Sequence, residues 1–190
     1  MTTESIFTPF TEEDLLPQEE KLEIVRKHQN ISIGIPKEPC LDEKRTCITP
    51  DAVQVLVANG HSIFIEEGAG LGAFFTDLQY AEVGATIVKT PQEAFQQDLV
   101  LKINPPTREE IQYLKPYSYL ISALQINLRD ADYFQSLSEK KINAIAFEFI
   151  LDEYKQLALV RLIGEIAGTA SVLYASELLS QSNGLMLGGI

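Results

Sequence analysis

The chain has 190 residues and a formal net charge of -12, with 45% hydrophobic and 22% charged residues. This size and composition suit one α/β domain with an appendage, long enough to bury a core. The acidic excess argues against nucleic acids and against an anionic membrane surface, because phosphate groups would be repelled, but it allows a local basic pocket.

Residues 1–30 are polar and acidic as far as Glu20, and a short amphipathic stretch follows at Leu22, Ile24 and Val25. We expect an N-terminal arm with one docked helix, and we find no apolar core of a signal peptide. A cytoplasmic protein is therefore expected.

The cysteines and histidines are few. Cys40 and Cys47 flank a short charged loop, which favours two unpaired thiols in a reduced compartment over a disulfide. The chain has no CxxC motif and only two histidines, His28 and His61, so we expect no metal site.

From Ile31 onward, short apolar runs alternate with capped amphipathic segments. Several runs are rich in Ile and Val on both faces, which is typical of strands covered by helices on each side. The strand candidates are Ile31–Ile35, Ser62–Glu66, Ala85–Val88, Asp98–Ile103, Ser118–Ala123 and Ile142–Phe147. Repeated strand–helix–strand units predict a mostly parallel sheet with helices on both faces, a flavodoxin- or Rossmann-like α/β fold.

Threonines mark the beginnings of four predicted helices. An N-cap threonine accepts an otherwise unpaired backbone N–H, and a Glu or Gln three residues later returns to the N-cap N–H. Thr49 is followed by Pro50 at the first helical position. The other three sites have the full capping-box pattern: Thr76–Gln79, Thr90–Glu93 and Thr107–Glu110.

The segment Leu157–Gln181 is long enough for about seven helical turns. Arg161, Glu165 and Glu177 interrupt it, so we expect a buried helix of a soluble protein and not a membrane span. An apolar stripe (Ile163, Ile166, Ala170, Leu173, Tyr174) lies beside a stripe of small residues (Gly164, Gly168, Ser171, Ala175). The small stripe indicates tight packing on a partner helix or a second domain, and the alternative is an ordinary amphipathic core helix.

The run Gly68–Gly72 lies between a predicted strand and a predicted helix, as dinucleotide-binding glycines do. Its third spacing departs from GxGxxG, the helix cap lies beyond it at Thr76, and it is not the first strand–helix turn. We therefore expect a turn here and no cofactor site.

Two cations are expected beyond the carboxyl ends of the strands, where open α/β sheets bind ligands. Arg45 lies in the first strand–helix connection, and its planar guanidinium suits a carboxylate, although a lone loop arginine would be a solvated charge. Lys102 closes an apolar strand and needs an anionic ligand or a carboxylate as partner. Together they predict a pocket for a small carboxylate.

The sequence from Ile33 to Val88 contains GIPKE, an R-x3-TP spacing at Arg45 and a GAG turn, and Lys102 follows in DLVLKINPP. With INAIAFEFI, GEIAG and GLMLGGI, this pattern resembles the N-terminal domain shared by alanine dehydrogenases and the α subunits of proton-translocating nicotinamide nucleotide transhydrogenases. The resemblance implies a substrate-binding domain over 31–152 and, over 153–190, a connecting helix and the start of a nucleotide-binding domain that this chain lacks. It also implies NAD or NADP, bound mainly by that absent domain, and a homo-oligomer.

The resemblance assigns roles to three residues. Arg45 would hold the carboxylate of alanine or pyruvate, and Lys102 would bind on the keto-oxygen side. Gln125 stands where alanine dehydrogenases carry a proton-transferring histidine, and an amide cannot exchange a proton near neutral pH. Loss of a general acid–base typically costs roughly 10²–10⁴ in rate. Lys102 and Gln125 are the expected catalytic residues, and all three are expected to contact the substrate.

His61 cannot replace that histidine, since it opens the second strand at the opposite end from the pocket. The resemblance to transhydrogenase α subunits is also incomplete. They lack the histidine too, but they carry a loop with Arg, Gln and Asp after the strand that matches Ala144–Phe149. The corresponding segment here, Leu151–Gln156, is shorter and has no arginine, and Glu165 in GEIAG is nearer to the dehydrogenase form. The expected function is the substrate side of an alanine dehydrogenase-like NAD-dependent oxidoreductase, inactive as this chain alone. The alternatives are a transhydrogenase-like domain, a non-catalytic module that binds amino or keto acids, and a structural domain without a ligand.

Overall fold

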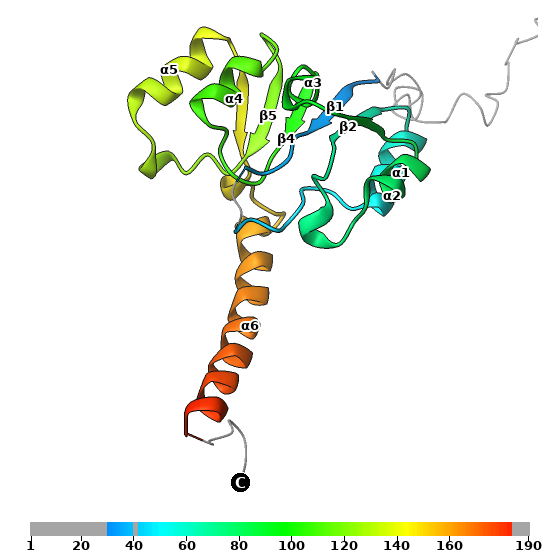
Figure 1. Cartoon of the computed structure of the whole chain (residues 1–190). Coiled ribbons are helices and arrows are strands. Elements are labelled where there is room, and N and C mark those ends of the chain that lie inside the picture. Colours follow the sequence, from blue (N-terminus) through cyan, green and yellow to red (C-terminus); the bar gives the residue numbers. More distant parts are fainter. Residues whose placement is uncertain (1–29, 40–41, 184–190) are drawn as a thin grey trace, which may run out of the picture.

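A computed structural model describes residues 30–39 and 42–183, in which a six-stranded sheet forms the body and one long helix extends from it (Figure 1). The strand order is β3-β2-β1-β4-β5-β6, and every neighbouring pair is parallel. The strands are β1 (Ser32–Ile35), β2 (Ser62–Glu66), β3 (Thr86–Val88), β4 (Leu99–Leu101), β5 (Tyr119–Ser122) and β6 (Asn143–Ala146). All six predicted strands are confirmed, whereas the predicted N-terminal arm, apart from Asn30, and the last segment from 184 lie outside the described residues.

The helices are α1 (Pro50–Ala58), α2 (Asp77–Glu82), α3 (Pro91–Phe95), α4 (Arg108–Tyr113), α5 (Ala131–Glu139) and α6 (Ala158–Asn183). The four threonine starts are confirmed at α1 to α4. In the box at Thr107, its Oγ1 accepts the Glu110 N–H at 3.1 Å and Glu110 accepts the Thr107 N–H at 2.7 Å. Helix α5 lies outside the predicted set, because its cap is Asp130, which accepts the Tyr133 N–H at 3.0 Å.

The strand order decides which helices share a face. The chain moves outward from β1 to β3 and then returns through β4 to β6, so right-handed crossovers place α1 and α2 on one face and α3 to α5 on the other. Gly34 of β1 lies under α3, where an added Cβ would come within 1.8 Å of the Ala94 carbonyl oxygen. Only glycine therefore allows α3 to cross the sheet at this distance.

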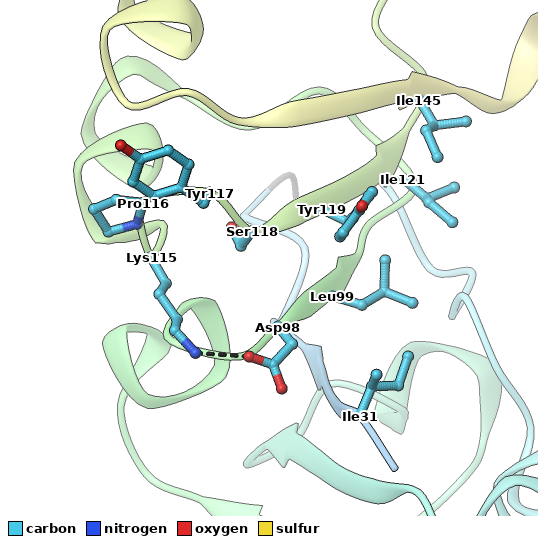
Figure 2. Close-up of a pocket in the computed structure, with 10 residues that line it drawn as sticks. All are labelled: Ile31, Asp98, Leu99, Lys115, Pro116, Tyr117, Ser118, Tyr119, Ile121 and Ile145. Carbon is cyan, nitrogen blue, oxygen red and sulfur yellow. Dashed lines mark hydrogen bonds and ion pairs between the residues drawn. The ribbon is translucent and has the colours of Figure 1, made fainter. Parts of the chain in front are cut away.

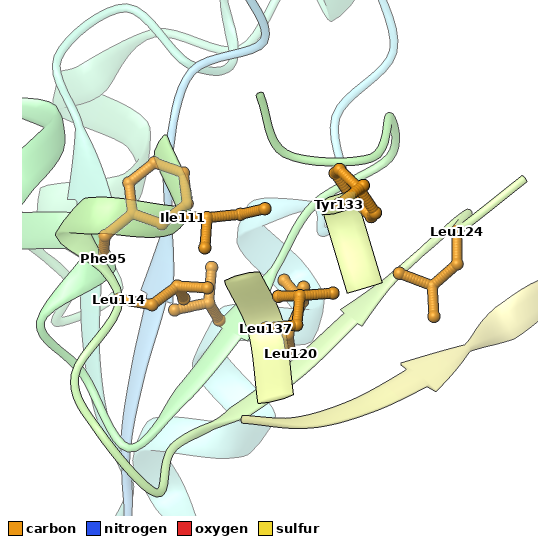
Figure 3. Packing of buried hydrophobic residues seen from close by; sticks show 8 residues of the cluster. Phe95, Ile111, Leu114, Leu120, Leu124, Tyr133 and Leu137 are labelled. Carbon is orange, nitrogen blue, oxygen red and sulfur yellow. The ribbon is translucent and has the colours of Figure 1, made fainter. Parts of the chain in front are cut away.

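Each face has its own apolar cluster. The first, between α1, α2 and strands β1 and β2, comprises Ile33, Ile35, Val53, Ile63, Ile65, Tyr80 and Ala85. The second, under α3 to α5, comprises Phe95, Val100, Ile111, Leu114, Leu120, Leu124, Tyr133 and Leu137 (Figure 3). Most of these side chains are almost completely buried, so the two clusters hold helices to both faces of the sheet.

Among the residues that the structure describes, helices cover strands β4 to β6 on one face of the sheet only. The register aligns Ile33 with Leu99 and Leu99 with Tyr119, so these side chains lie on the face of α1 and α2. Those two helices contact β2 and β3, and beyond them Tyr119 is 51% and Ile145 41% exposed. Figure 2 shows the apolar recess that results, about 500 Å³ in volume, with Lys115 and Asp98 at its rim.

Helix α6 runs away from the sheet (Figure 1), and the prediction that it is buried is wrong for this chain. Among the described residues, most side chains of α6 are exposed to solvent, and Ile166 is 72% exposed. A Cβ added at Gly164 or Gly168 would meet nothing within 4 Å. The alternative of an ordinary core helix is therefore also wrong here. The apolar composition of α6 correctly suggested a surface suited to packing, but composition does not say which segment or partner packs on it.

The exposed part of α6 has a further property. Residues Ala158–Gln181 have a mean hydropathy of 1.4, so by length and composition alone this helix could cross a membrane. Length and composition do not distinguish such a span from a helix that packs on another protein surface. The absence of membrane insertion remains a prediction.

Candidate functional site

Lys102 follows β4 directly and is buried at the carboxyl edge of the sheet. Its backbone N–H extends the pairing with β5 by donating to the Ile121 carbonyl at 3.0 Å. Its Nζ donates to Glu38 Oε2 at 2.7 Å and lies 3.5 Å from Glu110 Oε1, and the side chain has no exposed surface. A buried ammonium requires such partners, since an unpaired one would carry a large desolvation cost.

Glu38 connects two loops that lie far apart in the sequence. Besides Lys102, its carboxylate accepts the Ile103 N–H at 2.7 Å and a 3.3 Å hydrogen bond from Asn104 Nδ2. Because Glu38 follows β1 and these donors follow β4, one carboxylate joins the two strand ends. Glu110 has a similar double role, since it completes the cap of α4 and faces Lys102.

Arg45 lies in the same region but is engaged differently. Its Nε donates to Glu43 Oε1 at 2.8 Å and its Nη2 to Glu43 Oε2 at 2.6 Å, a two-bond pair. The hydrogen bond from Arg45 lowers the pKa of Glu43, and reciprocally Glu43 raises the pKa of Arg45. Both groups are therefore charged at neutral pH, with the Arg45 side chain 57% exposed and that of Glu43 11% exposed.

The structure brings the two predicted cations to one cavity of about 400 Å³. Arg45, Cys47 and Lys102 line it together with apolar side chains of β5, of the segment after β6 and of the first turns of α6. Both cations are paired, however, because three carboxylates (Glu38, Glu43, Glu110) surround them. The sequence predicted the cations at this edge but not the acidic residues that meet them there.

Cys47 is a free and exposed cysteine at this cavity, while Cys40 lies outside the described residues. Its thiol opens to solvent on one side, but desolvation by the surrounding protein atoms and then the charge of Glu38 raise its pKa to about 12. The thiol is consequently protonated at neutral pH and is a poor nucleophile.

Gln125 occupies a neighbouring hollow and not the cavity of Arg45 and Lys102. Its backbone is left-handed, with φ of 50°. Glu148, just after β6, accepts the Leu124 N–H at 3.2 Å and the Gln125 N–H at 2.8 Å. Sequence reasoning missed Glu148, although an acidic residue directly after a strand could have drawn attention to it.

His61 and the glycine turn have structural roles that their contacts account for. His61 is at the amino edge of the sheet, where its Nδ1 accepts the Ile31 N–H at 3.3 Å, so it is far from the cavity as predicted. In the glycine turn, a Cβ at Gly70 would come 2.5 Å from the Tyr80 ring, and one at Gly72 would come 2.7 Å from the Lys44 carbonyl oxygen. These two glycines are therefore needed for packing within the chain, although the turn also lines an open hollow beside Glu43 and Arg45.

Comparison with known proteins assigns the family. Residues 34–167 match the family model of the alanine dehydrogenase/PNT N-terminal domain. The chain belongs to this family. Alanine dehydrogenase of Staphylococcus saprophyticus is 35% identical over 161 residues, which cover 83% of this chain and 43% of that protein. Alanine dehydrogenase 2 of Staphylococcus aureus (strain USA300) is 33% identical over 163 residues, covering 84% of this chain and 44% of that protein.

Solved structures agree with this assignment. An L-alanine dehydrogenase superposes with a TM-score of 0.78 at 31% identity, covering 84% of this chain and 45% of that one. A transhydrogenase from Sinorhizobium meliloti shares the fold, with a TM-score of 0.58 at 24% identity over 63% of this chain and 35% of that one. The chain thus spans less than half the length of these relatives.

Proposed function

We propose that this chain is the substrate side of an NAD(P)-dependent oxidoreductase of the alanine dehydrogenase type, which acts on L-alanine and pyruvate or a related 2-amino or 2-oxo acid. The observation that carries the proposal is the shared cavity of Arg45 and Lys102 at the carboxyl edge of a parallel sheet. Relatives that are at least 33% identical and named alanine dehydrogenase support the choice of substrate class.

In this proposal Arg45 makes the first contact. Its guanidinium is largely exposed and can bind the carboxylate of the ligand. Lys102 binds the keto or amino group of the ligand. Because its ammonium is shielded from solvent, this contact requires Glu38 and Glu110 to move away from it. Gln125 orients the ligand from the adjoining hollow, and its amide cannot transfer a proton.

We propose that a nicotinamide cofactor, when bound, would supply the hydride acceptor or donor, and that a nucleotide-binding domain outside the described residues would hold most of it. The glycine turn supports this view, because Gly70 and Gly72 are closely packed against the chain's own atoms. We further propose a cytoplasmic homo-oligomer in which the exposed small-residue stripe of α6 is a contact face.

A second candidate is a non-catalytic module that senses an amino or keto acid. Gln125 favours it, since an amide at this position removes the proton transfer expected of a dehydrogenase. Alanine-dependent formation of NADH by the product of the whole reading frame would favour the enzyme over the sensor. The same assay on Gln125→His would then measure the contribution of the missing proton transfer.

Calorimetric titration of the 190-residue chain with pyruvate and L-alanine tests the pocket itself. We expect binding that Arg45→Ala weakens by about tenfold or more, because a hydrogen bond between charged groups is lost. Arg108→Ala is the matched control, since Arg108 is an equally exposed arginine paired with Asp130 away from the cavity. A chain that binds neither acid, with no effect of Arg45→Ala, would refute the proposed function.

A further inference from the structure

Arg45 lies outside any helix or strand, and a carboxylate two residues earlier, Glu43, holds its side chain. This arginine lies in the irregular segment between β1 and α1, and its side chain is mostly exposed. Glu43 takes two of its donors, Nε and Nη2, along one edge of the guanidinium. Among the residues that the structure describes, Nη1 on the other edge has no hydrogen-bond partner. The planar group is therefore oriented on one side and available on the other.

Glu43 can hold Arg45 because it is itself fixed. Its Oε1 also accepts the backbone N–H of Arg45 at 3.1 Å, and its side chain is only 11% exposed. Asn104 Nδ2 lies 3.5 Å from Glu43 Oε2 and 3.3 Å from Glu38 Oε2. Since Glu38 holds Lys102, a line of polar contacts runs from one cation of the cavity to the other.

We propose that Glu43 is a positioning residue that presents the free edge of Arg45 to the carboxylate of the ligand. The inference rests on the proposed function and names the group that prepares its binding residue. Without these two hydrogen bonds from Arg45 to Glu43, the exposed arginine side chain would sample many rotamers. The entropy lost in ordering it on binding would then reduce the affinity for the ligand. Glu43 touches Arg45 and not the ligand, so its effect is exerted through the arginine.

The opposite role for the same contact is that Glu43 competes with the ligand for Arg45. The two roles predict opposite signs. A competitor, once removed, leaves Arg45 free and tightens ligand binding, whereas loss of a positioning residue weakens it. The use of a single edge of the guanidinium favours positioning, since a second carboxylate can approach without displacing the first.

The test is titration of the chain with pyruvate in Glu43→Gln, which keeps the shape of the side chain and removes its charge. We expect the Kd to rise by about three- to tenfold. Glu109→Gln is the matched control, because Glu109 is exposed, lies at the same hollow as Glu43 and does not bond Arg45. That control should leave the Kd within about twofold. Repeating both titrations in about 0.5 M salt screens simple charge effects and leaves the loss of positioning visible.

A second readout separates positioning from general stability. Lysine has no planar edge for Glu43 to hold, so in an Arg45→Lys background Glu43→Gln should have little further effect on the Kd. If Glu43 acted only by stabilising the loop, the same loss would appear in both backgrounds.

The outcomes distinguish this inference from the proposed function. Equal or tighter pyruvate binding by Glu43→Gln, with binding by the unchanged chain intact, would overturn the positioning role and leave the proposed function standing. Absence of pyruvate binding by the unchanged chain would overturn both.

Discussion

A lysine–carboxylate pair flanks each end of strand β4. The two pairs join the same chemical groups but differ greatly in their exposure to solvent. At the carboxyl end, Lys102 and Glu38 have side chains 0% and 8% exposed. At the amino end, Asp98 and Lys115 are 45% and 49% exposed and lie at the rim of the recess in Figure 2. The donor–acceptor distances, 2.7 and 2.6 Å, are nearly equal. Distance therefore says little about what each pair contributes, and burial decides it.

The buried pair is part of a cluster, whereas the exposed pair acts as a tether. Removal of Lys102 leaves two carboxylates, Glu38 and Glu110, without their cation at a place that water reaches poorly. At the amino end, loss of either partner costs little free energy, because water solvates the remaining charge. Asp98 stabilises the fold mainly because it also accepts the N–H of Ser32 at 3.2 Å and the Ser32 hydroxyl at 2.8 Å. The carboxyl edge thus depends on the ion pair, and the amino edge depends on hydrogen bonds between β1 and β4.

The largest expected effect comes from Lys102→Met. This change leaves Glu38 and Glu110, both largely shielded from water, without their cation, and we expect the free energy of unfolding to fall by about 3–5 kcal/mol. Urea denaturation at pH 7 measures it. The double variant Lys102→Met with Glu38→Gln should recover part of the loss, because one of the two unpaired charges is removed. A loss below about 1 kcal/mol in the single variant would show that the buried pair behaves like the exposed one.

An intermediate effect is expected for Glu148→Ala, which tests hydrogen bonding without an ion pair at the carboxyl edge. The change leaves the N–H groups of Leu124 and Gln125 without their acceptor, at a cost of about 1–2 kcal/mol. Hydrogen exchange of these two amides should accelerate more than that of the β5 interior. Glu153→Ala, at an exposed glutamate of the same segment between β6 and α6, serves as the control. Unchanged exchange at both amides would exclude this role for Glu148.

The smallest effect is expected for Asp98→Asn. Lys115 first, and then the hydrogen bonds from Ser32, lower the pKa of Asp98 from 3.8 to about 2. A carboxyl whose pKa is depressed in the folded state contributes stability above its unfolded pKa and loses it as the pH falls through the folded value. The contribution is thus present above about pH 4 and lost between about pH 4 and pH 2. Because the pair is exposed and screened, we expect at most about 1 kcal/mol at neutral pH.

Acid unfolding measures this last prediction. Asp98→Asn should be less stable than the unchanged chain at pH 7 and should show a shallower loss of stability between about pH 4 and pH 2. Asp132→Asn, at an exposed position on α5, is the matched control. An unchanged pH dependence in Asp98→Asn would contradict the assigned pKa, and a loss as large as that of Lys102→Met would remove the contrast between the two ends of β4.

Much of the fold could be predicted from the sequence because its signals are local. Capping boxes such as Thr107–Glu110 join residues three positions apart, and strand runs such as Ser62–Glu66 depend on their own composition. Helix α5 shows the limit of this reasoning, since an aspartate cap without a capping-box partner gave too weak a signal.

The sequence by itself determined the parallel sheet, the capped helices and the arrival of Arg45 and Lys102 at one edge, because strand direction follows from the alternation of strands and helices. Only the tertiary structure decided which groups those cations meet. Glu38 lies 64 residues before Lys102, and no local pattern joins them. It also decided that Gln125 lies in a separate hollow and that α6 is exposed, because contacts between distant segments depend on how loops and helices pack and not on spacing along the chain.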